Sequence, residues 1–266
     1  MATIHLTIAQ LEGNGYLPGG SAAPGDYEPI FQVAGVQHTL PAPLVSLAVA
    51  SNILTMALKS NTLQQLSLKD DGTSGSIANI TLARKSSGKD DPTSIYKIFS
   101  DPSGRHTIIT TLQGENFYLF EGWTKARPLP KCKMIIESVA WNPIASSITN
   151  NSNPLNRTST REILIGARNG TIFEALIDAH DDIFKTPDRI VQSLYSFSDR
   201  LPITGLHVEF LAGQASSKPI VVLVTSASRF YQFSGAVERR ADESGKLFEA
   251  IFAPYRDAAP SMSLCL

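Results

Sequence analysis

The sequence predicts an all-β fold, a β-propeller of four-stranded blades, and three observations carry this prediction. Short apolar segments of strand length alternate with turns rich in Gly, Pro, Asn and Asp along most of the 266 residues. These segments return in the same order four times. No long segment has the apolar spacing of an amphipathic helix.

Residues 1–42 are predicted to form a loop-rich amino-terminal arm. Turn-forming pairs such as Pro18-Gly19 and Pro24-Gly25 punctuate it. The run Ile30-Phe31-Gln32-Val33 has the composition of a strand. We therefore expect one possible strand in this arm.

Residues 43–252 are predicted to contain the blades. Each round consists of a first strand, a turn or insertion, an apolar β-branched strand, a tight turn and an alternating strand. The rounds begin at Val45, Ile95, Ile136 and Ile203, with steps of 50, 41 and 67 residues. Repeats of roughly 40–50 residues with four strands are typical of propeller blades, because one blade cannot bury its own faces and must pack against neighbours.

The longest step contains the segment 146–160, which is rich in Ser, Asn and Thr and is predicted to be a mobile loop. Residues 253–266 are predicted to form an irregular tail without a strand that could close a ring. Propellers typically have four to eight blades. About four blades therefore form either a small closed ring or, as we favour, part of a larger propeller.

Composition narrows the classes of function. Lys plus Arg total 23 and Asp plus Glu total 24, a net charge of −1, which argues against a general nucleic-acid binder and a polybasic membrane anchor. Two cysteines exclude a disulfide scaffold and a Cys-rich zinc module. The first residues lack the pattern of a signal peptide, and no apolar run reaches about 18 residues, so we expect a cytoplasmic chain.

No motif points to an enzyme or to a bound cofactor or metal. The sequence has no G-x-S-x-G nucleophile elbow, no phosphate-binding loop and no dinucleotide fingerprint. Cys132 lies between two lysines that could lower its thiol pKa, but it has no neighbouring base in the sequence. The cluster Asp178, His180, Asp181 and Asp182 is interpreted as a solvated acidic turn rather than a cation site. We therefore predict no catalytic, cofactor-binding or metal-binding residues.

Two further sets of residues remain as candidates. Trp123 lies in a predicted turn and is a weak candidate for contact with a partner protein. Lys97, Glu137 and His207 occur on the first strands of three rounds, at irregular offsets. A propeller enzyme with a site in the central channel would need such groups to converge there.

Four segments of the chain resemble, in order, motifs of the deep orange family of class C vacuolar sorting proteins. Ile95–His106 (IYKIFSDPSGRH) is similar to the hydrophobic-x-K-hydrophobic-F-x-D-x-x-G-x-H stretch of that family, and Ile136–Asn142 (IESVAWN) is similar to its ESVGWN strand. Ile163–Ala175 (ILIGARNGTIFEA) and Arg229–Gly235 (RFYQFSG) resemble its next hairpin and a later strand.

The resemblance implies an amino-terminal propeller of a membrane-tethering subunit of the HOPS and CORVET complexes. It implies a non-catalytic protein–protein interaction module that supports vesicle docking and fusion and intracellular protein transport. The implied partners are other class C subunits and, indirectly, Rab GTPases and SNAREs, with peripheral placement on the cytosolic face of late endosomes and vacuoles or lysosomes. Members of the family continue into a helical solenoid and a RING finger, so we expect this chain to be part of a longer protein.

The resemblance leaves one departure from the family and two alternative functions. The tail after Phe252 is expected to depart from the family pattern. The alternative functions are a propeller scaffold of an unrelated coat or trafficking complex and, less favoured, a propeller enzyme with a central-channel site.

Overall fold

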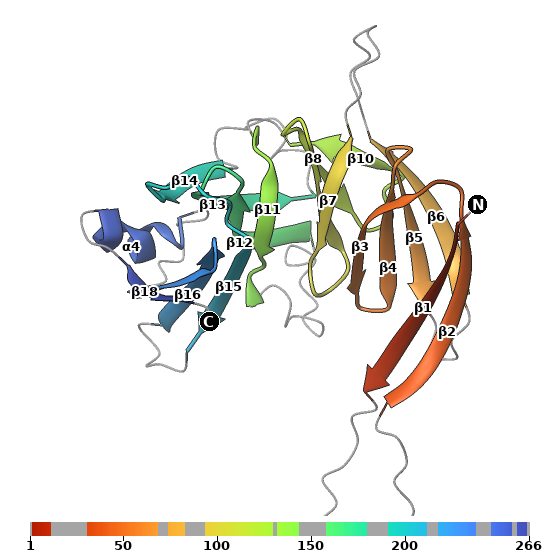
Figure 1. The fold of residues 1–266 in the computed structure, drawn as a ribbon, viewed down its shortest axis with the longest axis horizontal. Helices are drawn as coiled ribbons and strands as arrows, with labels where there is room; N and C mark the ends of the chain where they lie inside the picture. The colour runs from red at the N-terminus through yellow and green to blue at the C-terminus, as the bar shows by residue number, and fades with distance from the viewer. Residues whose placement is uncertain are drawn as a thin grey trace, which may run out of the picture.

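The structure is a computed structural model, and most of the residues that it describes lie in β-strands (Figure 1). It describes residues 2–11, 31–68, 74–82, 94–129, 132–143, 158–179, 191–211, 218–237, 246–256 and 260–264.

Four consecutive antiparallel meanders of four strands each make up the body of the chain. The first two are β3 (Leu44–Ala50), β4 (Ile53–Leu58), β5 (Thr62–Leu68) and β6 (Ser74–Leu82), then β7 (Ile95–Ser100), β8 (His106–Thr111), β9 (Asn116–Phe120) and β10 (Lys125–Pro128). The third is β11 (Ile136–Ala140), β12 (Ser159–Ala167), β13 (Thr171–Asp178) and β14 (Val191–Ser196). The fourth is β15 (Gly205–Phe210), β16 (Lys218–Ser226), β17 (Arg229–Val237) and β18 (Ser261–Leu264). The predicted all-β fold of four-stranded blades is confirmed.

Consecutive blades contact each other through their first strands. β3 contacts β7, β7 contacts β11, and β11 contacts β15. Figure 1 shows the first and fourth blades at opposite ends of this row. The described strands therefore form an arc in which β3 and β15 mark the two ends.

The apolar core lies between the blades. One cluster joins blades one and two, a second joins blades two and three, and the largest joins blades three and four. The second strands, β4, β8 and β12, are buried along nearly their whole length. This burial on both faces explains why most of each strand is apolar or β-branched, as in residues 163–167 of β12, rather than strictly alternating.

The turn after β7 shows how local sequence fixes a hairpin. The Asp101 carboxylate accepts hydrogen bonds from the backbone N–H groups of Ser103 (3.1 Å) and His106 (2.8 Å). Gly104 has a φ of 71°, and a Cβ there would lie 2.8 Å from the Ala50 carbonyl oxygen. Glycine is required at this position for both reasons.

Blades one and two are joined by a second type of contact. The short strand β10 pairs in parallel with β6, with Lys125 opposite Thr81 and Ala126 opposite Leu82. This pairing merges the two blades into one eight-stranded sheet.

The amino-terminal arm differs from the prediction of one strand. It contains β1 (Ala2–Leu11) and β2 (Phe31–Leu40), which pair along ten residues as a separate two-stranded sheet. Ile4, Leu6 and Ile8 alternate with polar residues, as in a strand with one apolar face. The Gly- and Pro-rich segment between the two strands obscured this signal.

The carboxyl-terminal tail also differs from the prediction of an irregular segment. After α4 (Glu249–Phe252) and the 3₁₀ helix η2 (Ala253–Arg256), the chain forms β18, which pairs with β17 and completes the fourth blade. Four residues after a proline carry little periodicity, so the strand is fixed by its long-range partner rather than by its own sequence. None of the helices within the described ranges has the length and apolar character needed to cross a membrane.

The predicted mobile loop at 146–160 falls mostly outside the described residues, because 144–157 are not among them. Ser159 and Thr160, however, already belong to β12. The Thr160 hydroxyl lies 3.1 Å from the Ile177 carbonyl oxygen and donates a hydrogen bond toward the neighbouring strand β13. The last two residues of the predicted loop are therefore the first two of the strand.

The first strand of the arc leaves an apolar stripe exposed. Val45, Leu47 and Val49 are 41%, 39% and 55% exposed on β3. The alternate residue Ser46 faces blade two, where its hydroxyl accepts a hydrogen bond from the Ile98 N–H (3.1 Å). Exposed apolar side chains on an edge strand favour association between molecules.

We expect the double substitution Leu47→Thr and Val49→Thr to reduce self-association, because it replaces apolar surface by polar groups that suit a strand. Light scattering of the purified chain should report a smaller average mass, with the melting temperature lowered by no more than about 4 °C. Val222→Thr, a change at a fully buried position of β16, serves as the control and should lower the melting temperature without reducing association. Equal scattering from the double variant and the parent chain would contradict this role for β3.

Candidate interaction site

Two of the three polar residues predicted on first strands meet between blades two and three. Lys97 Nζ on β7 lies 2.5 Å from Glu137 Oε2 on β11, and Arg168 Nε lies 2.7 Å from Glu137 Oε1. The Tyr96 hydroxyl donates a further hydrogen bond to Glu137 Oε2 (3.1 Å). His207 is not part of this group, because it lies on β15 and pairs with Glu209 at 3.3 Å.

The Glu137 cluster (Tyr96, Lys97, Glu137 and Arg168) is built to hold charge rather than to exchange protons. The Glu137 side chain is 6% exposed; burial alone would raise the pKa of its carboxyl, but the hydrogen bonds from Lys97 and Arg168 hold that pKa below its usual range. Burial likewise opposes a raised pKa at Lys97, and the contact with Glu137 outweighs it. Both carboxylate oxygens accept hydrogen bonds from these side chains, so Glu137 links blade two to blade three.

Trp123 lies in the turn between β9 and β10 and is half-buried. Its ring packs edge-on against Tyr118, with centroids 5.6 Å apart, and the Arg127 guanidinium lies 4.2 Å from its centroid. The indole thus contacts the clusters on both sides of blade two. Its role in contacting a partner stays a prediction.

The environment of Cys132 is the reverse of the one that its lysine neighbours indicated. The side chain is 1% exposed, and burial raises the pKa of its thiol to about 12 despite a hydrogen bond from Asn116. The Asn116 amide also donates to the Cys132 carbonyl oxygen (2.7 Å). Cys132 is therefore a core residue.

Among the described residues, no three His, Cys, Asp or Glu side chains are grouped in a way that could hold a metal ion. His180, Asp181 and Asp182 lie outside the described residues. His106 is buried in blade two, where its Nδ1 lies 2.7 Å from the Tyr118 hydroxyl.

A buried carboxylate that the sequence analysis missed lies between blades three and four. Glu174 on β13 is 1% exposed, and its Oε1 accepts hydrogen bonds from the backbone N–H groups of Leu247 (2.6 Å) and Phe248 (3.2 Å). Its Oε2 is buried and has no hydrogen-bond partner within the described residues. An acidic residue in the middle of an otherwise apolar strand was the available signal for a buried, partnered group.

Glu174 has an unusual proton affinity. Burial raises the pKa of its carboxyl to about 7, although the two backbone hydrogen bonds oppose this rise, and the nearby charges of Glu162 and Glu249 add to it. The contact holds the start of the 246–256 segment on blade three, just before α4.

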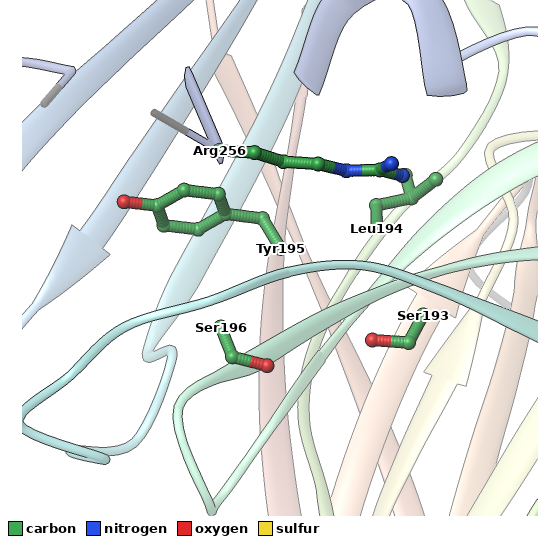
Figure 2. A pocket seen from close by; sticks show the side chains of 5 residues that line it. All are labelled: Ser193, Leu194, Tyr195, Ser196 and Arg256. Carbon is green, nitrogen blue, oxygen red and sulfur yellow. The ribbon is translucent and has the colours of Figure 1, made fainter. Parts of the chain in front are cut away.

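This segment also forms one wall of a pocket. The β14 pocket has a volume of about 400 Å³. Figure 2 shows Arg256 of η2 extending along one side of it, with Ser193, Leu194, Tyr195 and Ser196 of β14 around it. Of the lining residues that the structure describes, Arg256 is the charged one, and its ion pair with Glu249 is long, at 3.7 Å.

The fold and these sites define a β-propeller in which the buried carboxylates Glu137 and Glu174 join one blade to the next or anchor a segment between blades. The comparison with protein families agrees with that class. The model of the Pep3/Vps18/deep orange β-propeller domain matches residues 29–265, and the chain belongs to this family. The match includes the tail after Phe252, so the expected departure from the family there is wrong.

Three curated proteins are similar to this chain. The vacuolar protein sorting-associated protein 18 homolog of Danio rerio is 29% identical over 240 residues, covering 88% of this chain and 22% of that protein. Vacuolar sorting protein 18 of Arabidopsis thaliana is 30% identical over 191 residues (70% and 17%). The vacuolar membrane protein pep3 of Schizosaccharomyces pombe is 32% identical over 169 residues (63% and 17%).

The chain thus spans about a fifth of the length of the curated relatives that it matches. Among solved structures, the computationally designed Ika4 protein overlays 76% of this chain and 94% of its own, at 12% identity and a TM-score of 0.41, which is too distant a likeness to bear on function.

We expect Glu137→Gln to destabilise the fold by about 1–3 kcal/mol, because it leaves Lys97 and Arg168 without a buried counter-charge. Urea unfolding would measure this loss as a lower midpoint. Glu121→Gln, which removes the partly exposed pair with Arg105 at 3.7 Å, is the matched control and should change stability by less than about 0.5 kcal/mol. Similar losses in both variants would show that the Glu137 cluster does not join the blades.

We expect Glu174 to make the protein less stable as the pH rises. Its pKa is higher in the folded state than its ordinary value of 4.5, so the folded state binds the extra proton and this stabilisation is lost between about pH 4.5 and 7. Between pH 5 and pH 8, the free energy of unfolding of Glu174→Gln, measured with urea, should rise by roughly 1–3 kcal/mol relative to that of the parent. Parallel pH profiles for the two proteins would contradict the buried, protonatable state of Glu174.

Proposed function

We propose that this chain is a non-catalytic protein–protein interaction module of a membrane-tethering complex of the HOPS/CORVET type, acting in vesicle docking and fusion and in intracellular protein transport. The family match over residues 29–265 carries the proposal. The names of the three relatives refer to vacuolar sorting or to the vacuolar membrane.

The polar clusters support an interaction role over an enzymatic one. A propeller enzyme needs polar groups that converge at its channel and have atoms available to contact a substrate. Here Lys97 and Glu137 do converge, but they neutralise each other and Arg168 takes the second carboxylate oxygen. Among the described residues, this cluster has no carboxylate oxygen left to act as a base.

The proposed partners are the other class C subunits of the complex, with Rab GTPases and SNAREs reached indirectly through them. The proposed location is the cytosolic face of late endosome and vacuole or lysosome membranes, with attachment through the complex only. In this assignment, blades 43–252 present loops and rims to partners, and Trp123 is a candidate contact.

Co-purification tests the proposal. A tagged full-length protein that contains this chain is expected to recover the other class C subunits from cell extract at physiological salt. The tagged S. pombe relative provides the positive control and an unrelated tagged propeller the negative control. Failure of the full-length protein to recover these subunits, while the S. pombe relative recovers its own, would overturn the proposed function.

A further inference from the structure

The blades differ in how their outer edges are covered. In blades one and two, the outer strands β6 and β10 pair with each other. In blade three, β14 ends the sheet, and within the described residues no strand pairs with its outer edge. The outer edge of a sheet presents backbone N–H and C=O groups that can pair with another strand.

A bulge fixes the side chains of β14 and exposes its small polar groups. The register shifts between Ile172 and Phe173 of β13, where Leu194 is the extra residue of β14. Leu194 is buried, and the Tyr195 ring packs against Phe233 with centroids 5.2 Å apart. The serines on either side of this pair are exposed, so small side chains flank the edge and leave its backbone accessible.

The wall opposite this edge is anchored from two sides. Ile251 and Phe252 of α4 are fully buried in the cluster between blades three and four. Glu174 holds the backbone N–H groups at the start of the same segment. This anchoring positions Arg256 at the pocket, where its side chain is 54% exposed. An exposed ion pair at 3.7 Å is weak, so the guanidinium is available to a stronger acceptor.

We propose that the β14 pocket docks an extended acidic peptide segment, which adds as a strand to the outer edge of β14 and places a carboxylate on Arg256. Strand addition provides the backbone hydrogen bonds, and a side-chain contact of this kind provides selectivity. The positive charge that Arg256 brings to the described part of the lining is the complement of that carboxylate. The inference rests on the proposed function as an interaction module and names the chemistry of one partner segment.

Fluorescence anisotropy with the 266-residue chain tests the proposal. The probe is a fluorescein-labelled peptide, Gly-Thr-Val-Glu-Val-Thr, and its two matched forms carry Gln in place of Glu or N-methyl groups on alternate amides. We expect the Gln form to bind about tenfold more weakly and the N-methylated form not to bind, because the first lacks the charge and the second cannot pair with a strand edge.

Two protein variants complete the test. Arg256→Glu is expected to weaken binding of the acidic probe by about tenfold or more, with an unchanged melting temperature. Lys59→Glu reverses an exposed charge in the turn after β4 and should leave binding within about twofold. Binding that is equal for all three peptides, or equal for Arg256→Glu and the parent, would overturn the proposal. A second outcome would also overturn it: the probe does not bind, and Arg256→Glu changes the average mass that light scattering reports for the parent chain. The edge of β14 would then be occupied by a second copy of this chain.

These results are separable from those of the proposed function. Recovery of class C subunits together with no binding of the acidic probe would reject the β14 pocket and leave the interaction module standing. Probe binding without recovery of those subunits would reject the assignment to the tethering complex and keep the docking site.

Discussion

The packing of one blade on the next is the constraint on which the rest of the structure depends. A four-stranded sheet has two faces, and strands such as β8 are apolar or β-branched on both. A single blade cannot remove both faces from water, so stability has to come from neighbours. This is why the three largest clusters lie between blades and why the fold is a row of repeated units.

Two buried carboxylates cross blade boundaries, and they do so by opposite electrostatic means. Glu137 is compensated by two cations and a hydroxyl, so it stays charged. Within the described residues, Glu174 accepts hydrogen bonds from two backbone N–H groups and contacts no cation, and its pKa of about 7 leaves its carboxyl about half protonated near pH 7. The stability of the Glu137 contact is therefore insensitive to pH near neutrality, whereas the stability of the Glu174 contact changes with pH in that range.

The sequence predicted the parts of the fold that local pattern controls. The repeated apolar segments identified the four blades, and turn residues such as Gly104 marked their hairpins. It did not predict β18 or the hairpin of β1 and β2, because their pairing partners lie far away in sequence or behind a long Gly- and Pro-rich segment. Lys97 and Glu137 were identified singly, but their meeting depends on how two blades pack. Glu174 was missed because its hydrogen-bond partners lie 73 and 74 residues away in the sequence. Arg256 was missed because its place in the pocket depends on how a short helix packs beside a distant strand.

The parallel contact between β6 and β10 has a consequence for the order of folding during synthesis. The edge of β6 is completed by residues 125 and 126, some forty positions further along the chain than Thr81 and Leu82. A ribosome adding roughly 5–20 residues per second leaves that edge open for several seconds. Blade one therefore reaches its final form only after the last strand of blade two has been synthesised, and until then the edge of β6 is open to pairing with another strand.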